Sequence, residues 1–216
     1  MKSYKIHLIR HGLAEGNEEG RFLGVTDAPL SKKGKEEIEY LSKAREYPRA
    51  SVVYTSPLIR CSQTAEILYP DRLIVPVDSL REYNFGLFDG KTPEELKDNE
   101  AFIKWTEGKM KDTPPLGETN NDFTKRCIAA INEILLDMQK RKVYSAAAVT
   151  HSGVILRLMY LFDIEKRPPQ EYFCKNGKGF TVMITPELWQ RDGIFEVLSR
   201  IPESEENKDY GFYNLD

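Results

Sequence analysis

The sequence predicts an α/β fold with a mostly parallel central sheet and helices on both faces of it. Short apolar runs alternate with amphipathic helical segments along most of the chain. The run "YSAAAVT" at 144–150 is small and apolar throughout, as in a strand that is covered on both sides. The length of 216 residues suits one domain, 1–216, and we expect a lid-like insertion within it at about residues 83–123.

The first half of the chain has three strand-like runs separated by helical segments. Ser31 is a suitable N-cap for the first helix, in which Ile38 and Leu41 share one face, and Pro57 suits the start of the second helix. Pro76 indicates that the third strand lies at a sheet edge, because proline cannot donate to a ladder. The predicted elements are a strand at 4–9, a glycine-rich loop at 12–30, a helix at 32–47, a strand at 51–56, a helix at 58–68 and a strand at 73–77.

The second half opens with an irregular or short-helical stretch, which Pro114 and Gly117 help to end. A long amphipathic helix follows, with Phe123, Cys127 and Ile131 on its apolar face. The polar tail from residue 202 onward carries no assignment. The predicted elements are an irregular or short-helical segment at 81–117, a helix at 121–140, a strand at 144–150, a helix at 152–162 and two adjacent strands at 180–185 and 195–201.

The composition excludes broad classes of partner. The 31 basic and 34 acidic residues leave a net charge of −3, which predicts no general attraction to nucleic acid or to a membrane surface. The three cysteines, Cys61, Cys127 and Cys174, are widely spaced and form no C-x-x-C pair, as in a reducing compartment. We therefore expect a cytoplasmic location, with a homodimer left open. A substrate anion would have to be bound by a local cluster of positive charge.

Charged side chains and histidines follow four predicted strands at the points where the strands end. Arg10 and His11 follow the first strand, Arg60 lies just after the second, Glu82 follows the third and His151 follows "YSAAAVT". Ligands of open parallel sheets bind beyond the carboxyl ends of the strands. The sequence therefore predicts that these five side chains surround one crevice.

This set of residue types is typical of phosphoryl transfer. Guanidinium groups bind phosphate oxygens in a bidentate manner, and a neutral imidazole is a competent nucleophile toward phosphorus. A carboxylic acid nearby can protonate the departing alkoxide. The set predicts transfer through a phosphohistidine without a metal ion or other cofactor.

Several segments resemble the histidine phosphatase superfamily, in the branch that contains cofactor-dependent phosphoglycerate mutase and α-ribazole phosphatase. They are "LIRHG", "FLGVTDAPLSKKG", "TSPLIRCSQTA", "LREYNFGLFDG" and "VTHSG", which occur in the family's order between about residues 5 and 160. The segment "PPLGETNNDFTKR" at 114–126 is similar to ribazole-phosphatase-like members. Val25 and Asp89 depart from the residues that many relatives have, which bears on substrate identity more than on chemistry.

The resemblance implies a role for each site residue. His11 would be the nucleophile, Glu82 the proton donor, and Arg10, Arg60 and His151 the phosphate pocket. Further substrate contacts are expected from Asn17, from Ser152 and from the backbone near Gly24. The implied activity is a metal-independent phosphomonoester hydrolase that acts on a small phosphorylated metabolite, as α-ribazole phosphatases do.

Two other functions compete with this interpretation. The same pocket serves a cofactor-dependent phosphoglycerate mutase, although the insertion lacks an obvious cluster of extra basic residues beyond Lys91 and Lys97. A phosphate-binding module without catalysis is disfavoured because His11 and Glu82 are both present.

Other phosphate-handling motifs do not fit the sequence. "GLFDGKT" at 86–92 has one residue too few between its glycines for a nucleotide-binding P-loop. A cysteine phosphatase needs an arginine six residues after its cysteine, and those positions hold Ile67, Glu133 and Phe180. His7 lies inside the first strand and is expected to be structural, whereas Phe85 and Trp105 are candidates for the lid.

Overall fold

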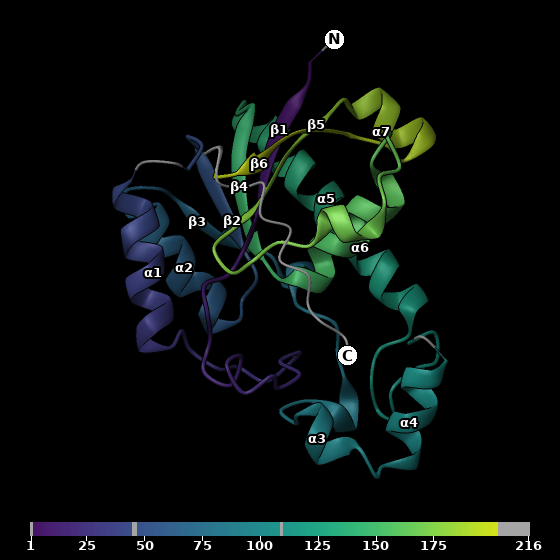
Figure 1. Cartoon of the computed structure of the whole chain (residues 1–216). Coiled ribbons are helices and arrows are strands. Elements are labelled where there is room, and N and C mark those ends of the chain that lie inside the picture. The colour runs from purple at the N-terminus through teal and green to yellow at the C-terminus, as the bar shows by residue number, and fades with distance from the viewer. Residues whose placement is uncertain (1, 45–46, 109, 203–216) are drawn as a thin grey trace.

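The computed structural model describes residues 2–44, 47–108 and 110–202, and the tail left unassigned above lies outside them after residue 202. A six-stranded sheet in the order β3-β2-β4-β1-β5-β6 forms its centre (Figure 1). The strands are β1 (Tyr4–Arg10), β2 (Val52–Thr55), β3 (Ile74–Pro76), β4 (Ser145–Thr150), β5 (Gly179–Ile184) and β6 (Glu196–Ile201). The α-helices are α1 (Lys32–Lys43), α2 (Ile59–Leu68), α3 (Pro93–Leu96), α4 (Glu100–Glu107), α5 (Asn120–Arg141), α6 (Ser152–Phe162) and α7 (Pro186–Asp192), and the 3-10 helices are η1 (Asp78–Leu80), η2 (Gly86–Phe88) and η3 (Pro169–Tyr172).

The sheet is parallel over its first four strands and antiparallel over the last two. β2 pairs in parallel with β3 and β4, and β4 pairs in parallel with β1. β5 runs antiparallel to both β1 and β6. The predicted fold class is confirmed, including the edge position of β3 and the pairing of the last two strands.

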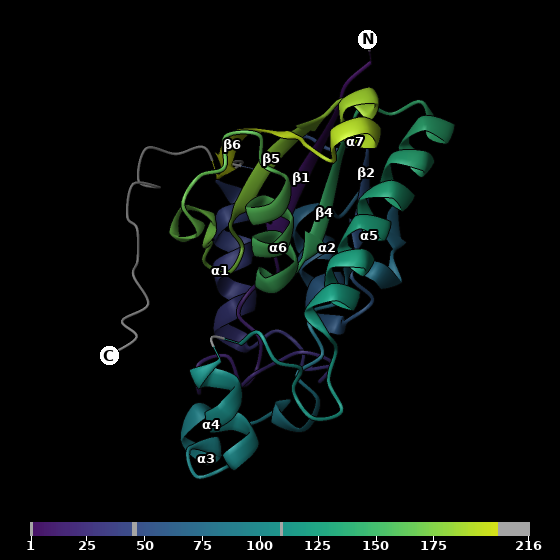
Figure 2. The same cartoon turned by 90° about the vertical axis from the view of Figure 1, so that its right-hand side faces the viewer.

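Helices cover both faces of the sheet because the strands are apolar on both sides. Ile6 and Leu8 of β1 pack in one core with the buried faces of α5 and α6. Ile9, the next residue along, packs in a second core with Ile38 of α1 and Ala65 of α2. Figures 1 and 2 show α1 and α2 on one side of the sheet and α5, α6 and α7 on the other.

The structure differs from the predicted elements at the end of the first helix and between the last two strands. The sequence predicts a first helix that runs to residue 47, but α1 ends at Lys43, with Ala44 as its C-cap, and residues 45 and 46 lie outside the described part. The segment 186–192, which the sequence analysis left between two strands, forms α7 with a proline in its first turn and Gly193 at a left-handed C-cap.

The predicted insertion carries α3 and α4 and lies beyond one end of the sheet (Figures 1 and 2). It has a small core of its own, in which Phe88, Leu96, Phe102 and Trp105 are buried together. Its start and end lie side by side, since the backbone N–H of Glu118 donates to the carbonyl of Asn84 at 3.0 Å. Its action as a lid stays a prediction.

The three cysteines carry free thiols, and Cys61 and Cys127 are buried. In the part of the chain that the structure describes, no helix combines the length and the apolar character that crossing a membrane requires.

Candidate active site

The ends of β1 and β4 bring two histidines together. Arg10 and Thr150 are partners in the parallel ladder, and the backbone N–H of His11 donates to the Thr150 carbonyl at 2.9 Å. The residue that follows each strand is a histidine, so His11 and His151 lie at the same edge of the sheet. The ring centroids of His11 and His151 are 5.1 Å apart in an edge-to-face arrangement, and both side chains are buried.

The hydrogen bond of His11 fixes its tautomer. Nδ1 lies 2.6 Å from the carbonyl oxygen of Gly12, which only accepts, so Nδ1 carries the proton. Nε2 then holds the lone pair. Burial, Arg60 and Arg10 together lower the pKa of His11 well below its usual value, so the ring is neutral and nucleophilic near pH 7.

Two small polar side chains contact the ring of His151. Its Nε2 lies 2.8 Å from Ser56 Oγ and 3.5 Å from Cys61 Sγ. Burial lowers the pKa of His151 well below its usual value, and the neighbouring His11 and Arg60 lower it further.

Two arginines approach the histidine pair with unsatisfied donors. The guanidinium of Arg60 donates to the carbonyls of Thr26, Leu23 and Gly24, and that of Arg10 donates to Cys174. The Nε atoms of Arg10 and Arg60 are buried and have no hydrogen-bond partner among the described residues. Unpaired buried donors are costly, and a bound phosphate would satisfy such groups.

Glu82 is buried beside this cluster. Its carboxylate accepts from the backbone N–H of Gly153 and from that of Tyr83, each at 2.9 Å. Burial raises the pKa of Glu82, and these two N–H groups and the nearby arginines offset only part of that rise. The raised pKa favours the protonated form of this carboxyl group, which is the form that donates a proton.

The remaining predicted site residues lie at different depths. Gly24 is buried and its carbonyl binds Arg60, as above, while the Ser152 hydroxyl lies 3.4 Å from Glu82 Oε2. The side chain of Asn17 accepts from the backbone of Ala14, so its described hydrogen bonds stay within its own loop. His7, as predicted, is part of the fold, with its ring nitrogens near Thr181 and Ser145.

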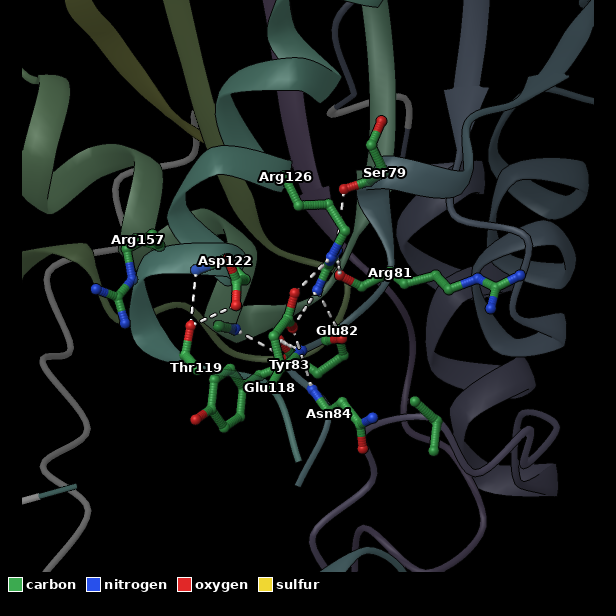
Figure 3. Close-up of polar contacts among 12 residues, drawn as sticks. Ser79, Arg81, Glu82, Tyr83, Asn84, Glu118, Thr119, Asp122, Arg126 and Arg157 are labelled. Carbon is green, nitrogen blue, oxygen red and sulfur yellow. Dashed lines mark hydrogen bonds and ion pairs between the residues drawn. The ribbon is translucent and has the colours of Figure 1, made fainter. Parts of the chain in front are cut away.

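The sequence analysis assigned no role to Arg126, which ties the Glu82 segment to α5 (Figure 3). Its guanidinium donates to the backbone carbonyls of Ser79, Arg81 and Glu82 and to both oxygens of Glu118. Both Glu118 and Arg126 lie in the motif "PPLGETNNDFTKR", so the similarity of that segment was the available signal.

The loop before β5 was also missed. The side-chain amide of Asn176 donates to the His11 carbonyl at 3.0 Å, and the N–H of Gly177 donates to the Arg10 carbonyl at 3.0 Å. These contacts join residues far apart in the sequence, which pattern and spacing do not reveal.

A cavity of about 680 Å³ adjoins the cluster on the side of Glu82. Glu82, Ser152 and Gly153 form part of its wall, and aromatic side chains form most of the rest. Among the residues described, no group of three His, Cys, Asp or Glu side chains is arranged to hold a metal ion.

The comparison with protein families decides the classification. The model of the histidine phosphatase superfamily (branch 1) matches residues 6–191. The chain belongs to this superfamily. The histidine phosphatase match confirms the resemblance deduced from the motifs, and the protein is an enzyme of the phosphatase type.

Individual relatives include phosphatases and mutases. Phosphoserine phosphatase 1 of Hydrogenobacter thermophilus is 30% identical over 179 residues, which cover 80% of this chain and 83% of the relative. The 2,3-bisphosphoglycerate-dependent phosphoglycerate mutase 2 of Gloeobacter violaceus is 27% identical over 177 residues, which cover 77% and 81%.

Two solved structures of phosphoglycerate mutases are similar to this chain in fold. A phosphoglycerate mutase from Bacillus anthracis str. Sterne aligns with a TM-score of 0.71 at 22% identity and covers 92% of both chains. A phosphoglycerate mutase from Thermus thermophilus aligns with a TM-score of 0.65 at 26% identity and covers 91% of this chain and 97% of its own.

Proposed function

We propose that this histidine phosphatase hydrolyses phosphomonoesters of a small metabolite through a phosphohistidine on His11. The observation that carries the proposal is the buried pair of His11 and His151, with ring centroids 5.1 Å apart, beside two arginines whose Nε donors lack partners among the described residues. Neutral His11 supplies the nucleophile, and the arginines supply charge that matches the phosphoryl oxygens.

The reaction has two steps. Nε2 of His11 attacks phosphorus, the bond from phosphorus to the ester oxygen breaks, and the departing oxygen takes a proton from Glu82. Water then attacks the phosphohistidine and gives a proton to the Glu82 carboxylate. Inorganic phosphate leaves, and both His11 and Glu82 return to their starting states. The two arginines neutralise the phosphoryl oxygens in both steps, and His151 lies beside them as a neutral hydrogen-bonding ring.

A mutase would need cationic groups to hold the carboxylate of a phosphoglycerate as well as its second phosphate. Of the described residues that line the cavity beside Glu82, Arg157 alone is a lysine or arginine. This lining favours hydrolysis over mutase activity. Phosphate release measured against isomerisation of 3-phosphoglycerate, with bisphosphoglycerate as primer, separates the two.

The test of the mechanism is rapid quench with a phosphate-labelled substrate. We expect acid-labile phosphate on the wild-type enzyme and none on His11→Ala, which should also lose turnover. His7→Gln is the matched control, since His7 is a buried histidine of β1, the strand that precedes His11, and has no place in the scheme. Turnover without a labelled intermediate, or labelling that survives in His11→Ala, would contradict the proposal.

The cytoplasmic location, the absence of a metal requirement and a homodimer remain predictions of the sequence. Assays in the presence of a chelator test the second, and the mass of the protein in solution tests the third.

A further inference from the structure

We propose that the substrate's alcohol carries a flat apolar ring. This inference rests on the proposed function and adds the substrate class to it. The features that carry it are the position and the aromatic lining of the cavity beside Glu82.

The cavity lies where the leaving alcohol must be. In an in-line transfer, the departing oxygen is opposite the attacking nitrogen of His11 and next to the proton donor. Glu82, the proposed donor, forms part of the cavity wall together with Ser152 and Gly153. The alcohol attached to that oxygen therefore extends into this space of about 680 Å³, a volume within the range of small-ligand sites.

The lining favours an apolar ring. Phe22, Phe85, Phe123 and Phe173 contribute aromatic surface to the wall. Arg157 also lines it, hydrogen bonds to the Asn120 side chain and lies 5.4 Å from the Phe123 ring centroid. An apolar ring that leaves water here is stabilised by burial against these aromatic side chains.

The first experiment compares two esters that share a primary alkoxide leaving group, propyl phosphate and 3-phenylpropyl phosphate. We expect kcat/KM for the phenylpropyl ester to exceed that for the propyl ester by about 30-fold, as burial of one phenyl group predicts. Equal rates for the two esters, or a preference for propyl phosphate, would overturn the inference.

The second experiment alters the wall. Phe173→Ala should lower the ratio of phenylpropyl to propyl kcat/KM about fivefold, because exposed aromatic surface at the cavity is lost. Tyr40→Ala is the matched control, since Tyr40 is an exposed aromatic residue outside the cavity. A ratio that changes equally in both variants would contradict the assignment.

p-Nitrophenyl phosphate separates the substrate class from the proposed function. If this ester shows no His11-dependent turnover, the proposed function is contradicted. If it is turned over but the alkyl esters show no ring preference, the substrate class alone is contradicted.

A different observation leads to a second inference, that Arg126 is a positioning residue for Glu82. One guanidinium binds the carbonyls of Ser79, Arg81 and Glu82 at 3.0, 2.6 and 3.1 Å (Figure 3). It also pairs with both oxygens of Glu118 at 2.9 and 2.7 Å. All five donors of the fork are thus used on the segment that carries Glu82 and on the end of the insertion.

The arrangement restrains the backbone of Glu82 without touching its carboxylate. The segment after η1 has no sheet or helix ladder of its own, so the fork of Arg126 supplies bonds that secondary structure does not. A lysine has three donors and no planar fork, so it cannot hold the same set of oxygens.

The test uses the dependence on the leaving group. We expect Arg126→Ala to lower kcat on propyl phosphate at least about tenfold more than kcat on p-nitrophenyl phosphate, because the latter scarcely needs a proton donor. Arg126→Lys should give an intermediate ratio, and Glu118→Gln a smaller change of the same sign. Arg141→Ala, which breaks the Arg141–Asp137 ion pair at the other end of α5, should leave the ratio as in the wild type. Equal losses on both esters in Arg126→Lys would overturn the positioning role.

Discussion

The carboxylate of Glu82 accepts a hydrogen bond from the backbone N–H of Gly153 at 2.9 Å, two residues beyond His151. Gly153 lies in the first turn of α6, where N–H groups have no partner within the helix. A methyl group at Gly153 would overlap Oε1 of Glu82. The start of this helix is therefore shaped to the proposed proton donor.

Replacing Gly153 by alanine should displace that carboxylate while leaving the fold intact. Alanine favours a helix over glycine by about 0.5–1 kcal/mol, so the melting temperature should not fall. We expect kcat on alkyl phosphates to fall about tenfold or more, with a smaller loss on p-nitrophenyl phosphate. If the effect runs through Glu82, Gly153→Ala should add no further leaving-group dependence in a Glu82→Gln background, and additive losses would argue against it.

Glu82→Gln removes the acid and keeps the shape of the side chain. Poor leaving groups should slow by about 100-fold or more, while nitrophenolate, which leaves without a proton, should slow far less. Because burial raises the pKa of Glu82, the variant should also lose the basic limb of the wild-type pH profile on alkyl esters. Equal losses on both kinds of ester would refute the donor role.

The buried histidines should make stability depend on pH. Burial lowers the pKa of His151 well below 6.5, so below pH 6.5 the unfolded chain binds a proton that the folded chain excludes. The free energy of unfolding should then fall as the pH drops, by about 1.4 kcal/mol per pH unit for this group. Glu82, whose pKa is raised, acts in the opposite sense above its usual value of 4.5.

The contribution of His151 is isolated by comparing the wild type with His151→Gln in urea unfolding at about pH 7.5, 6.5 and 5.5, which brackets the ordinary histidine pKa. The variant should lose less stability between the two lower pH values, by about 1 kcal/mol, because the unfolded histidine is already half protonated at about pH 6.5. Tyr40→Ala should keep the wild-type slope. A slope that His151→Gln leaves unchanged would show that the imidazole protonates in the folded state.

Asp89 should act on phosphate affinity through the loop at 24–26. Its carboxylate accepts from the backbone N–H groups of Gly24, Val25 and Thr26. The carbonyls of Gly24 and Thr26 accept from the guanidinium of Arg60. Asp89→Asn turns one acceptor into a donor, so we expect the inhibition constant of inorganic phosphate to rise about tenfold, as for loss of a charge-assisted hydrogen bond. Asp98→Asn, an exposed site in the same insertion, should leave it unchanged, and a rise in both variants would contradict this path.

The parts of the fold that the sequence predicted are those with a strong local pattern. Each of these patterns lies within one segment, such as the small apolar run of β4 or the apolar faces of α5 and α6. The rule that ligands bind beyond the ends of parallel strands then predicted that His11 and His151 lie together. The early end of α1 was not predicted, because Lys43 and Ala44 are good helix formers and the pattern continues past them.

The hydrophobic and motif patterns of the sequence did not predict contacts between distant loops. Arg126 donates to three backbone carbonyls. Because every residue has a backbone carbonyl, the sequence does not indicate which ones an arginine binds. The bond from Asn176 to His11 likewise depends on β5 joining β1 in antiparallel fashion. The character of the cavity was hidden for the same reason, since its wall combines side chains from the β1–α1 loop, the insertion, α5, α6 and η3.

The adjacency of Asn84 and Glu118 has an evolutionary consequence. The chain between them leaves the sheet and returns to it at adjacent residues, and the ion pair of Arg126 with Glu118 holds the returning end. Away from Asp89, which binds the 24–26 loop, a segment attached in this way can change its length or surface while the histidines keep their positions. Descendants of one ancestral phosphatase could thereby acquire new metabolites by rewriting this one module.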